Sequence, residues 1–166
     1  MLTNITFRDA VIDDLPAIVG TYNATIPSRL VTADLEPVSI ESKKEWFFAH
    51  NPKTRPLYII EADNQYAGWM SYTNFYGRPA YNKTAELSIY LETTMQGRGL
   101  GNYCLKYAIT QCPALNITTL LGFIFGHNQP SLNLFYKHGF IKWAHLPQVA
   151  DMDGTLQDLL ILGKKV

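Results

Sequence analysis

The run Ala85-Glu86-Leu87-Ser88-Ile89-Tyr90-Leu91 decides the fold, and it leads through residues 92–95 into Gln96-Gly97-Arg98-Gly99-Leu100-Gly101. Alternation predicts a strand over 84–91, with Glu86, Ser88 and Tyr90 on one face and the aliphatic residues on the other. A helix is expected over 102–111. Glycines let backbone N–H groups crowd around an anion, and a helix N-terminus adds roughly half a positive charge. The loop, with Arg98 at its rim, is therefore predicted to bind a pyrophosphate group.

Two other phosphate-binding motifs do not fit this loop. A P-loop requires Gly-x-x-x-x-Gly-Lys followed by Ser or Thr, and no such pair follows here. A dinucleotide-binding turn requires Gly-x-Gly-x-x-Gly early in a β–α–β unit, whereas this chain has Gly-x-Gly-x-Gly after a predicted hairpin. The alternative that stays open is a loop that only caps the following helix.

Outward from this loop, hydrophobic periodicity predicts a series of strands and helices in one domain over residues 1–166. Strands are expected at 3–7, 57–62, 66–72, 84–91, 118–125, 141–145 and 156–162, and helices at 13–23, 43–50, 102–111 and 130–138. The turn 63–65 joins two of the strands as a hairpin. This series is typical of an α/β (α+β) fold with a mixed sheet and helices on both faces.

Composition and charge exclude several classes of protein. Of 166 residues, 47% are hydrophobic, which favours a folded domain over a disordered chain. Fourteen basic residues balance fourteen acidic ones, which counts against a nucleic-acid-binding protein. The longest apolar stretch, 118–125, is too short to cross a bilayer. Residues 1–10 alternate as a strand and carry Arg8 and Asp9, unlike a signal peptide.

Cysteine and histidine spacing argues against disulfides and metals. Cys104 and Cys112 lie eight residues apart in a helical pattern, too far for a disulfide bond within one continuous helix. The four histidines show no metal-ligand spacing. We expect a reduced, cytoplasmic protein without a metal ion.

Two motifs occur in a defined order in the second half of the chain. Gln96, Gly99 and Gly101 fill the three fixed places of the pattern Gln/Arg-x-x-Gly-x-Gly/Ala. Downstream, 128–131 and 135–140 are similar to the pattern Asn-x-x-Ser/Ala followed by Tyr-x-x-x-Gly-Phe. Together these motifs resemble the GNAT superfamily of N-acetyltransferases. The resemblance implies a GNAT fold: a mixed, mostly antiparallel central sheet of about six to seven strands, helices on both faces, and a splay that holds acetyl-CoA.

A narrower resemblance spans nearly the whole chain. It rests on Asn23, Trp46, Gly68, 78–81, 84–86, 88–90 and 146–149. These residues resemble the phosphinothricin and methionine sulfoximine acetyltransferase branch, which moves acetyl from acetyl-CoA to the α-amine of small amino-acid analogues. The chain departs from the branch at Tyr136, where the branch usually has His, and at Leu156, where it usually has Trp.

The resemblance also assigns the contacts with acetyl-CoA. The backbone of residues Ile89, Tyr90 and Leu91 would pair with the pantetheine amides, as an added strand pairs with a sheet edge. The pyrophosphate would be bound by Gln96, Gly97, Arg98, Gly99, Leu100 and Gly101. Asn128 and Ser131 would hold the arm from the opposite side. Asn128 has a second interpretation, as the N-cap of the helix predicted at 130–138.

Three groups of side chains are expected to carry the reaction. Glu86 is the expected general base, directly or through a water, because a protonated amine must lose a proton before it attacks. Tyr136 is the expected acid for the CoA thiolate, since phenols and thiols have similar proton affinities. Arg78 can take a carboxylate with two parallel hydrogen bonds, and with Tyr81 and Thr25 it is expected to bind the acceptor. The open alternatives are a solvated surface carboxylate for Glu86, a core aromatic for Tyr136 and an exposed loop cation for Arg78.

The resemblance further implies a homodimer and a small amino-acid-like acceptor, with neither nucleic acid nor a membrane as partner. Two other functions stay open: acetylation of another amine (a polyamine, an aminoglycoside or a protein N-terminus), or a non-catalytic acyl-CoA-binding module. A net charge of zero fits poorly with a polycationic acceptor. The presence of Glu86, Asn128 and Tyr136 together argues against the non-catalytic module.

Overall fold

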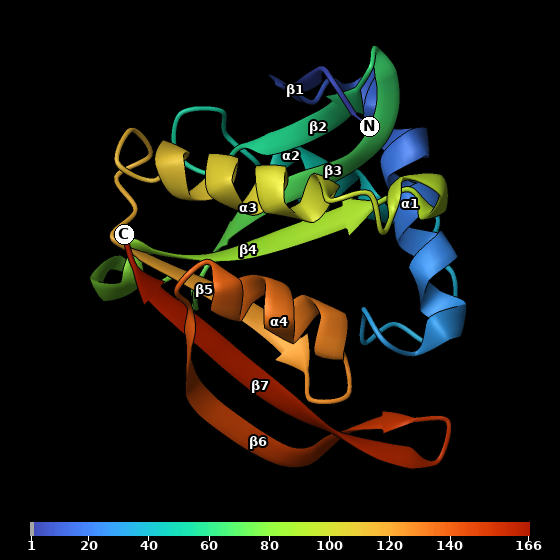
Figure 1. Ribbon diagram of the computed structural model, residues 1–166, viewed down its shortest axis with the longest axis vertical. Helices are drawn as coiled ribbons and strands as arrows, with labels where there is room; N and C mark the ends of the chain where they lie inside the picture. The colour runs from blue at the N-terminus through green and yellow to red at the C-terminus, as the bar shows by residue number, and fades with distance from the viewer. Residues whose placement is uncertain (1) are drawn as a thin grey trace.

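The structure is a computed structural model that describes residues 2–166 (Figure 1). One seven-stranded sheet runs in the order β1-β2-β3-β4-β5-β7-β6. The strands are β1 (Ile5–Asp9), β2 (Leu57–Ala62), β3 (Gln65–Asn74), β4 (Thr84–Leu91), β5 (Thr119–Phe125), β6 (Ile141–Met152) and β7 (Thr155–Lys165). The α-helices are α1 (Leu15–Thr25), α2 (Lys44–Phe48), α3 (Leu100–Gln111) and α4 (Gln129–Lys137). Only β4 and β5 pair in parallel, which confirms the predicted mixed, mostly antiparallel sheet within the described residues.

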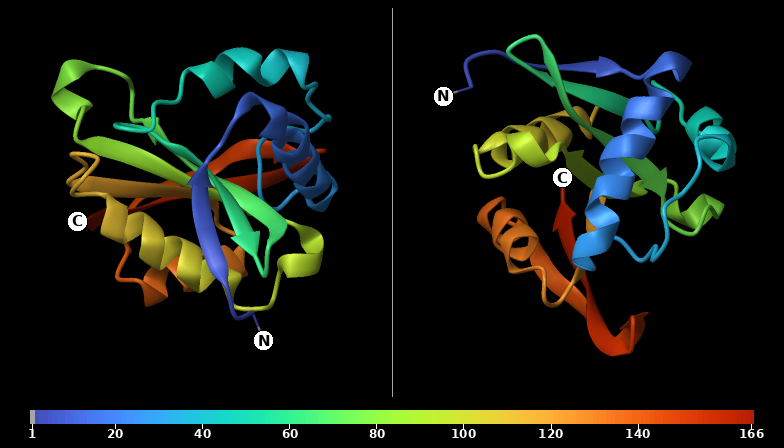
Figure 2. Two further views of the ribbon diagram at one scale, coloured as in Figure 1. Left: turned by 90° about the horizontal axis from the view of Figure 1, so that it is seen from above. Right: turned by 90° about the vertical axis from the view of Figure 1, so that its right-hand side faces the viewer.

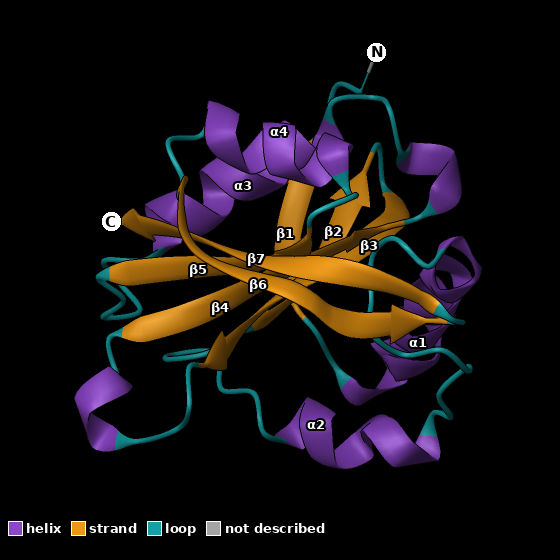
Figure 3. Cartoon of the chain, turned by 90° about the horizontal axis from the view of Figure 1, so that it is seen from below, coloured by secondary structure: helices purple, strands orange, loops and turns teal. Residues whose placement is uncertain are grey.

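The helices lie on both faces of the sheet, as the sequence predicts. α3 and α4 cover one face, whereas α1 and α2 cover the other (Figures 2 and 3). Alternation along β3 supplies both faces with core residues, because Met70 and Tyr72 are buried in the cluster that includes α3. Trp69 is buried instead with Leu15 and Ile18 of α1. The sheet is therefore the middle of three layers.

β4 and β5 separate after a short paired stretch (Figure 1). Three residue pairs join them, and the last pair is Glu86 with Leu121. β4 continues to Leu91 and β5 to Phe125, so the facing backbone groups beyond the last pair have no partner in the sheet. We call this divergence the splay, and it confirms the opening that the sequence predicts in the middle of the sheet.

The boundaries of several elements differ from the sequence-based expectation. The last two strands are longer than 141–145 and 156–162, because β6 continues through Pro147. Pro147 lies in a register irregularity between Leu146 and Ala150 on an edge strand, where a missing N–H is tolerated. The predicted helices at 13–23 and 43–50 each begin with a 3₁₀ turn before α1 and α2.

Two expectations about the chain as a whole can be set beside the structure. Cys104 and Cys112 are both free and buried. Within residues 2–166, no helix is long and apolar enough to cross a membrane.

Candidate active site

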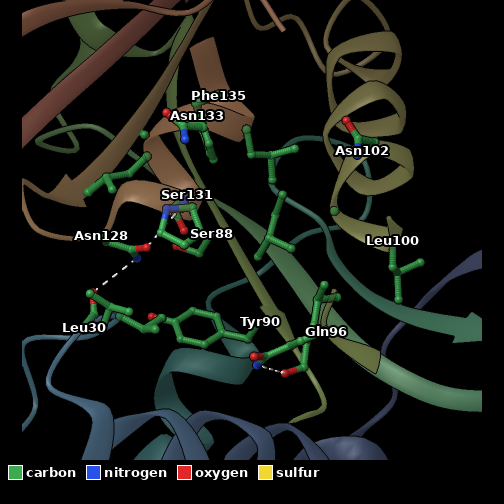
Figure 4. A pocket seen from close by; sticks show the side chains of 18 of the residues that line it. Leu30, Ser88, Tyr90, Gln96, Leu100, Asn102, Asn128, Ser131, Asn133 and Phe135 are labelled. Atoms are coloured by element: carbon green, nitrogen blue, oxygen red, sulfur yellow. Dashed lines mark hydrogen bonds between the residues drawn. The ribbon is translucent and has the colours of Figure 1, made fainter. Parts of the chain in front are cut away.

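The splay opens into a cavity of about 600 Å³, which we call the splay cavity. Strands β4 and β5, the loop before α3, and α4 line it together with Leu30 and Val31 of the α1–α2 connection (Figure 4). The predicted site residues that line it are Thr25, Ile89, Tyr90, Leu91, Gln96, Gly97, Gly99, Leu100, Gly101, Asn128 and Ser131. Arg98 is exposed and does not line it. The structure thus brings most of the predicted cofactor-binding residues to one cavity.

Two glycines shape the loop before α3. Gly97 has a φ of +70° and Gly99 a φ of +81°, left-handed conformations that residues with a Cβ rarely adopt. Gly99 is the N-cap of α3, so the unpaired N–H groups of the first helical turn lie beside the cavity. Gln96 donates a hydrogen bond from Nε2 to the Leu91 carbonyl at 3.3 Å, which ties the loop to β4. Backbone donors without side chains in front of them fit a pyrophosphate group.

Asn128 joins α4 to the opposite wall of the cavity. Its side chain is 6% exposed. Oδ1 accepts a hydrogen bond from the Ser131 N–H at 3.3 Å, which makes Asn128 the N-cap of α4. Nδ2 donates to the Leu30 carbonyl at 3.2 Å, a bond drawn in Figure 4. Contact between Asn128 and the pantetheine arm stays a prediction, whereas the capping of α4 by Asn128 is present in the structure.

Glu86 lies outside the splay cavity and lines a second cavity of about 220 Å³, which we call the Glu86 chamber. Ser88 and Tyr90 line both cavities, so they form the wall between them. The alternation predicted for β4 is therefore correct. Burial raises the pKa of the Glu86 carboxyl above its ordinary value. A carboxylate shifted in this direction is a stronger base at neutral pH, as general base catalysis requires.

The structure separates Tyr136 from the other predicted catalytic residue. Tyr136 is 41% exposed and does not line the splay cavity, whereas its neighbour Phe135 is 7% exposed and does. A Cβ built on Gly122 of β5 would lie 2.5 Å from Cε1 of Phe135, so this ring is pressed against the sheet. Successive helical residues point about 100° apart, so α4 cannot turn both rings inward. The placement does not support Tyr136 as the acid, nor as a core aromatic.

The predicted acceptor residues are divided between the cavity and a neighbouring loop. Thr25 is buried, lines the splay cavity and donates to the Tyr22 carbonyl at 2.7 Å. Arg78 and Tyr81 line neither cavity. The Tyr81 ring contacts Phe75 at 5.5 Å between centroids, and Phe75 lies 6.5 Å from Phe123, which lines the splay cavity. An aromatic cluster thus connects the Arg78 loop with the cavity.

The middle of the segment 29–32 is a part of the cavity wall that sequence reasoning missed. Leu30 and Val31 line the splay cavity. Arg29 Nε lies 2.6 Å from Oδ2 of Asp153 in the β6–β7 turn, and His127 Nε2 lies 2.9 Å from the Arg29 carbonyl. These contacts join residues 124 and 98 positions apart in the sequence, so no local pattern reveals them.

The fold and the site define a class of protein. Residues 20–140 match the model of the acetyltransferase (GNAT) family. This chain belongs to that family, and the resemblance predicted from the two sequence motifs is confirmed.

Particular relatives narrow the comparison. YwnH of Bacillus subtilis (strain 168), provisionally named a phosphinothricin acetyltransferase, is 52% identical over 163 residues, which cover 98% of this chain and 99% of that protein. An L-methionine sulfoximine/L-methionine sulfone acetyltransferase of Pseudomonas paraeruginosa (strain DSM 24068 / PA7) is 27% identical over 158 residues, 95% of this chain and 92% of that protein. The crystal structure of a phosphinothricin acetyltransferase from Sinorhizobium meliloti in complex with AcCoA has a TM-score of 0.91 at 24% identity, covering 99% of this chain and 89% of that chain. At 24% identity, the likeness to this last structure shows only that the two chains share a fold.

Proposed function

We propose that this chain is an N-acetyltransferase that moves the acetyl group of acetyl-CoA to the α-amine of a small amino acid or amino-acid analogue. The observation that carries the proposal is the splay cavity, which runs along the glycine loop before α3 and shares a wall with the chamber that holds Glu86. The activities named for its relatives, which match over nearly the whole chain, support this choice of acceptor.

Acetyl-CoA, when bound, supplies an acetyl thioester. The loop 96–101 and the N-terminus of α3 would hold its pyrophosphate. The backbone groups of residues 89–91 that face the splay and not β3 would exchange hydrogen bonds with the pantetheine amides, as a sheet edge does with an added strand. Asn128 and Ser131 would hold the arm from the α4 side. Nδ2 of Asn128 carries two hydrogens, so one remains for the arm while the other binds Leu30.

The main chemical task of the chain is to remove a proton from the acceptor amine. Glu86 would take that proton, directly or through a water, because it is the carboxylate beyond the Ser88 and Tyr90 wall. A thiol has a reference pKa of about 8.5, so a thiolate leaves readily without a nearby acid. Since Tyr136 lies outside the cavity, we assign it no part in this step.

Arg78 and Tyr81, with Thr25, would bind the α-carboxylate end of the acceptor. The aromatic cluster that joins their loop to Phe123 supports this role. Arg78→Ala should raise the KM for the amino acid by about tenfold, since a charge-assisted hydrogen bond is lost, and should leave the KM for acetyl-CoA unchanged. An equal loss for both substrates would mean that the loop is only structural.

The proposal is tested by an acetyl-transfer screen with purified protein, in which release of the free CoA thiol is followed. The acceptors are phosphinothricin, methionine sulfone, other free amino acids, spermidine and a peptide with a free N-terminus. Turnover with the amino acids supports the proposal. Turnover with spermidine or the peptide alone would establish the second candidate function, and CoA binding without turnover would indicate a non-catalytic module.

We also propose that the chain forms a homodimer in the cytoplasm, with neither nucleic acid nor a membrane as partner. The edge hairpin supports dimerisation, because Ile141, Trp143, Val149 and Leu156 are large apolar side chains left exposed on it. Light scattering should give about twice the mass of one chain. A monomer at all accessible concentrations would overturn this part of the proposal.

A further inference from the structure

The Glu86 chamber lies between the sheet and the α1–α2 layer, and four aromatic rings form one part of its wall. The rings of Trp69 and Tyr90 are stacked with centroids 4.5 Å apart. Trp46 meets Trp69 edge-on at 5.4 Å, and Tyr22 is tilted against Tyr90 at 5.2 Å. Ile18 of α1 adds an aliphatic surface. These rings and the aliphatic side chain offer a dry surface for a short hydrocarbon stem.

The sheet side of the chamber carries hydroxyl groups. Ser71 pairs with Ser88 and Thr73 with Glu86 across β3 and β4, so the four side chains share one face and lie next to one another. Ser71 is 2% exposed. Within residues 2–166, the hydroxyls of Ser71, Thr73 and Ser88 make no side-chain hydrogen bond to another protein group. Ser88 and Thr73 are half-buried, and all three residues line the chamber, so their hydroxyls can hydrogen-bond a molecule bound inside it.

A basic group faces the hydroxyls from the other layer. Lys43, just before α2, lines the chamber, and its Nζ lies 5.5 Å from the centroid of the Tyr22 ring. In the part of the chain that the structure describes, neither Lys43 nor Glu86 belongs to an ion pair. The chamber therefore has an uncompensated carboxylate in the sheet and an uncompensated ammonium in the helical layer.

We propose that the Glu86 chamber binds the side chain of the acceptor, and that this side chain has a short apolar stem and a tip of oxygen atoms that Lys43, Ser71 and Ser88 hydrogen-bond. The proposal rests on the function proposed above, because it places the acceptor amine beside Glu86. Hydroxyls and an ammonium are donors, so they select a tip that accepts hydrogen bonds. Lys43 further favours an anionic tip and disfavours a basic one.

The size of the chamber agrees with such a side chain. A volume of 220 Å³ corresponds to roughly seven water molecules at about 30 Å³ each. A side chain with a phosphinate or sulfone tip has about six non-hydrogen atoms beyond the α-carbon, so it displaces most of that water. Methionine sulfone and phosphinothricin both satisfy this description, and phosphinothricin adds the negative charge. Norleucine has a stem of similar length and no oxygen.

The experiment compares kcat/KM for phosphinothricin, methionine sulfone and norleucine in the wild type and in Lys43→Met. The variant keeps the stem of the side chain and removes its charge. We expect kcat/KM to fall about tenfold or more for phosphinothricin, less for methionine sulfone and under twofold for norleucine. Lys44→Met is the matched control, because Lys44 is exposed, pairs with Glu41 at 2.6 Å and does not line the chamber. It should leave all three values unchanged.

Binding can be measured without turnover, because two of the three tryptophans, Trp46 and Trp69, line the chamber. In a Trp143→Phe background, phosphinothricin should change tryptophan fluorescence, and Lys43→Met should abolish the change at the same concentration. An equal fall of kcat/KM for all three acceptors, or no fluorescence change at concentrations that saturate turnover, would overturn the proposal. A fluorescence change that depends on Lys43 in a protein that acetylates no amino acid would overturn the proposed function and leave the chamber as a binding site.

Discussion

At the scale of single residues, Glu86 loses solvation on folding and gains no hydrogen bond or ion pair in residues 2–166. Burial raises the pKa of this carboxyl above the value of 4.5 that we take for the unfolded chain. As pH rises past that value the unfolded state ionises first, so the folded state loses stability until pH passes the raised pKa. The stability contributed by the neutral carboxyl is thus present in acid and absent at neutral pH.

Glu86→Gln should therefore raise the melting temperature at about pH 7 and leave it unchanged at about pH 3, where wild-type Glu86 is protonated in both states. Thermal unfolding followed by circular dichroism measures both values. Glu45→Gln, which changes an exposed carboxylate of α2, is the control and should shift neither. A lower melting temperature for Glu86→Gln at neutral pH would reveal stabilising contacts of the carboxylate.

The same variant tests the chemistry. Glu86→Gln should lower kcat by about 10²–10⁴-fold, the usual contribution of a general base. In the wild type, kcat/KM should fall as pH decreases through the raised pKa of Glu86, because the carboxylate must be ionised to accept a proton. The variant should lose this acid limb. A limb that persists unchanged in Glu86→Gln would assign it to another group.

Tyr136 provides a second test, because the sequence-based assignment of the acid and the structure disagree about it. Counted back from Gly139 and Phe140, the Tyr place of the pattern Tyr-x-x-x-Gly-Phe falls on Phe135, the ring that lines the splay cavity. Tyr136→Phe should keep kcat within about twofold, because the hydroxyl of an exposed residue outside the cavity has no substrate to reach. Steady-state kinetics at several pH values checks this. A loss of a hundredfold, with an unchanged melting temperature, would restore Tyr136 as an acid.

The case of Tyr136 shows that a sequence pattern can predict which face of a strand a side chain lies on, but not which of two adjacent helical side chains points inward. On β4, two-residue alternation separates Glu86, Ser88 and Tyr90 from the aliphatic residues, and the structure agrees. On α4 the adjacent rings of Phe135 and Tyr136 differ in facing by about 100°, and only packing against Gly122 decides which one turns inward.

At the scale of elements, the loop before α3 depends on backbone geometry. Gly99 has a left-handed φ of +81°, and a Cβ there would meet no atom within 4 Å. Gly99→Ala should therefore cost only about 1 kcal/mol of stability through backbone strain. It should weaken CoA binding by more than that cost, because the first turn of α3 and the donors beside the cavity shift together.

Gly154→Ala is the matched control for this prediction. Gly154 also has a left-handed φ, of +88°, with no atom within 4 Å of a built Cβ, but it lies in the β6–β7 turn. Chemical denaturation should give similar losses of stability for the two variants. Calorimetry with CoA should show weaker binding in Gly99→Ala alone, and equal weakening in both would contradict a special role for the loop.

Helices and strands with a clear hydrophobic periodicity could be predicted from the sequence. Cavity walls formed by residues far apart in the sequence could not. The hairpin of β2 and β3 and the helix after the glycine loop follow from periodicity and turn residues. The segment 29–32 has no period, and Arg29 is held by Asp153 and His127 across the molecule. The Glu86 chamber likewise needs Lys43 and Trp69 from separate elements, so only the fold brings its parts together.

At the scale of the whole molecule, the cosubstrate should bridge the two halves of the sheet. A ligand at about 100 times its Kd stabilises the folded state by about 2.7 kcal/mol. In a domain of this size that free energy raises the melting temperature by roughly 5–10 °C. Thermal unfolding with and without CoA measures the shift. Gly99→Ala should show a smaller one, and no shift in the wild type would exclude the splay cavity as the CoA site.

The splay has a practical consequence for anyone who handles this protein. The backbone groups that face the splay, on β4 after Glu86 and on β5 after Leu121, form two sheet edges inside the molecule. An extended peptide that reaches these edges can add to the sheet as a strand, and a partly unfolded segment of a neighbouring copy is one such peptide. Coenzyme A bound as proposed would cover both edges, so preparations without it should become turbid sooner on storage than preparations that contain it.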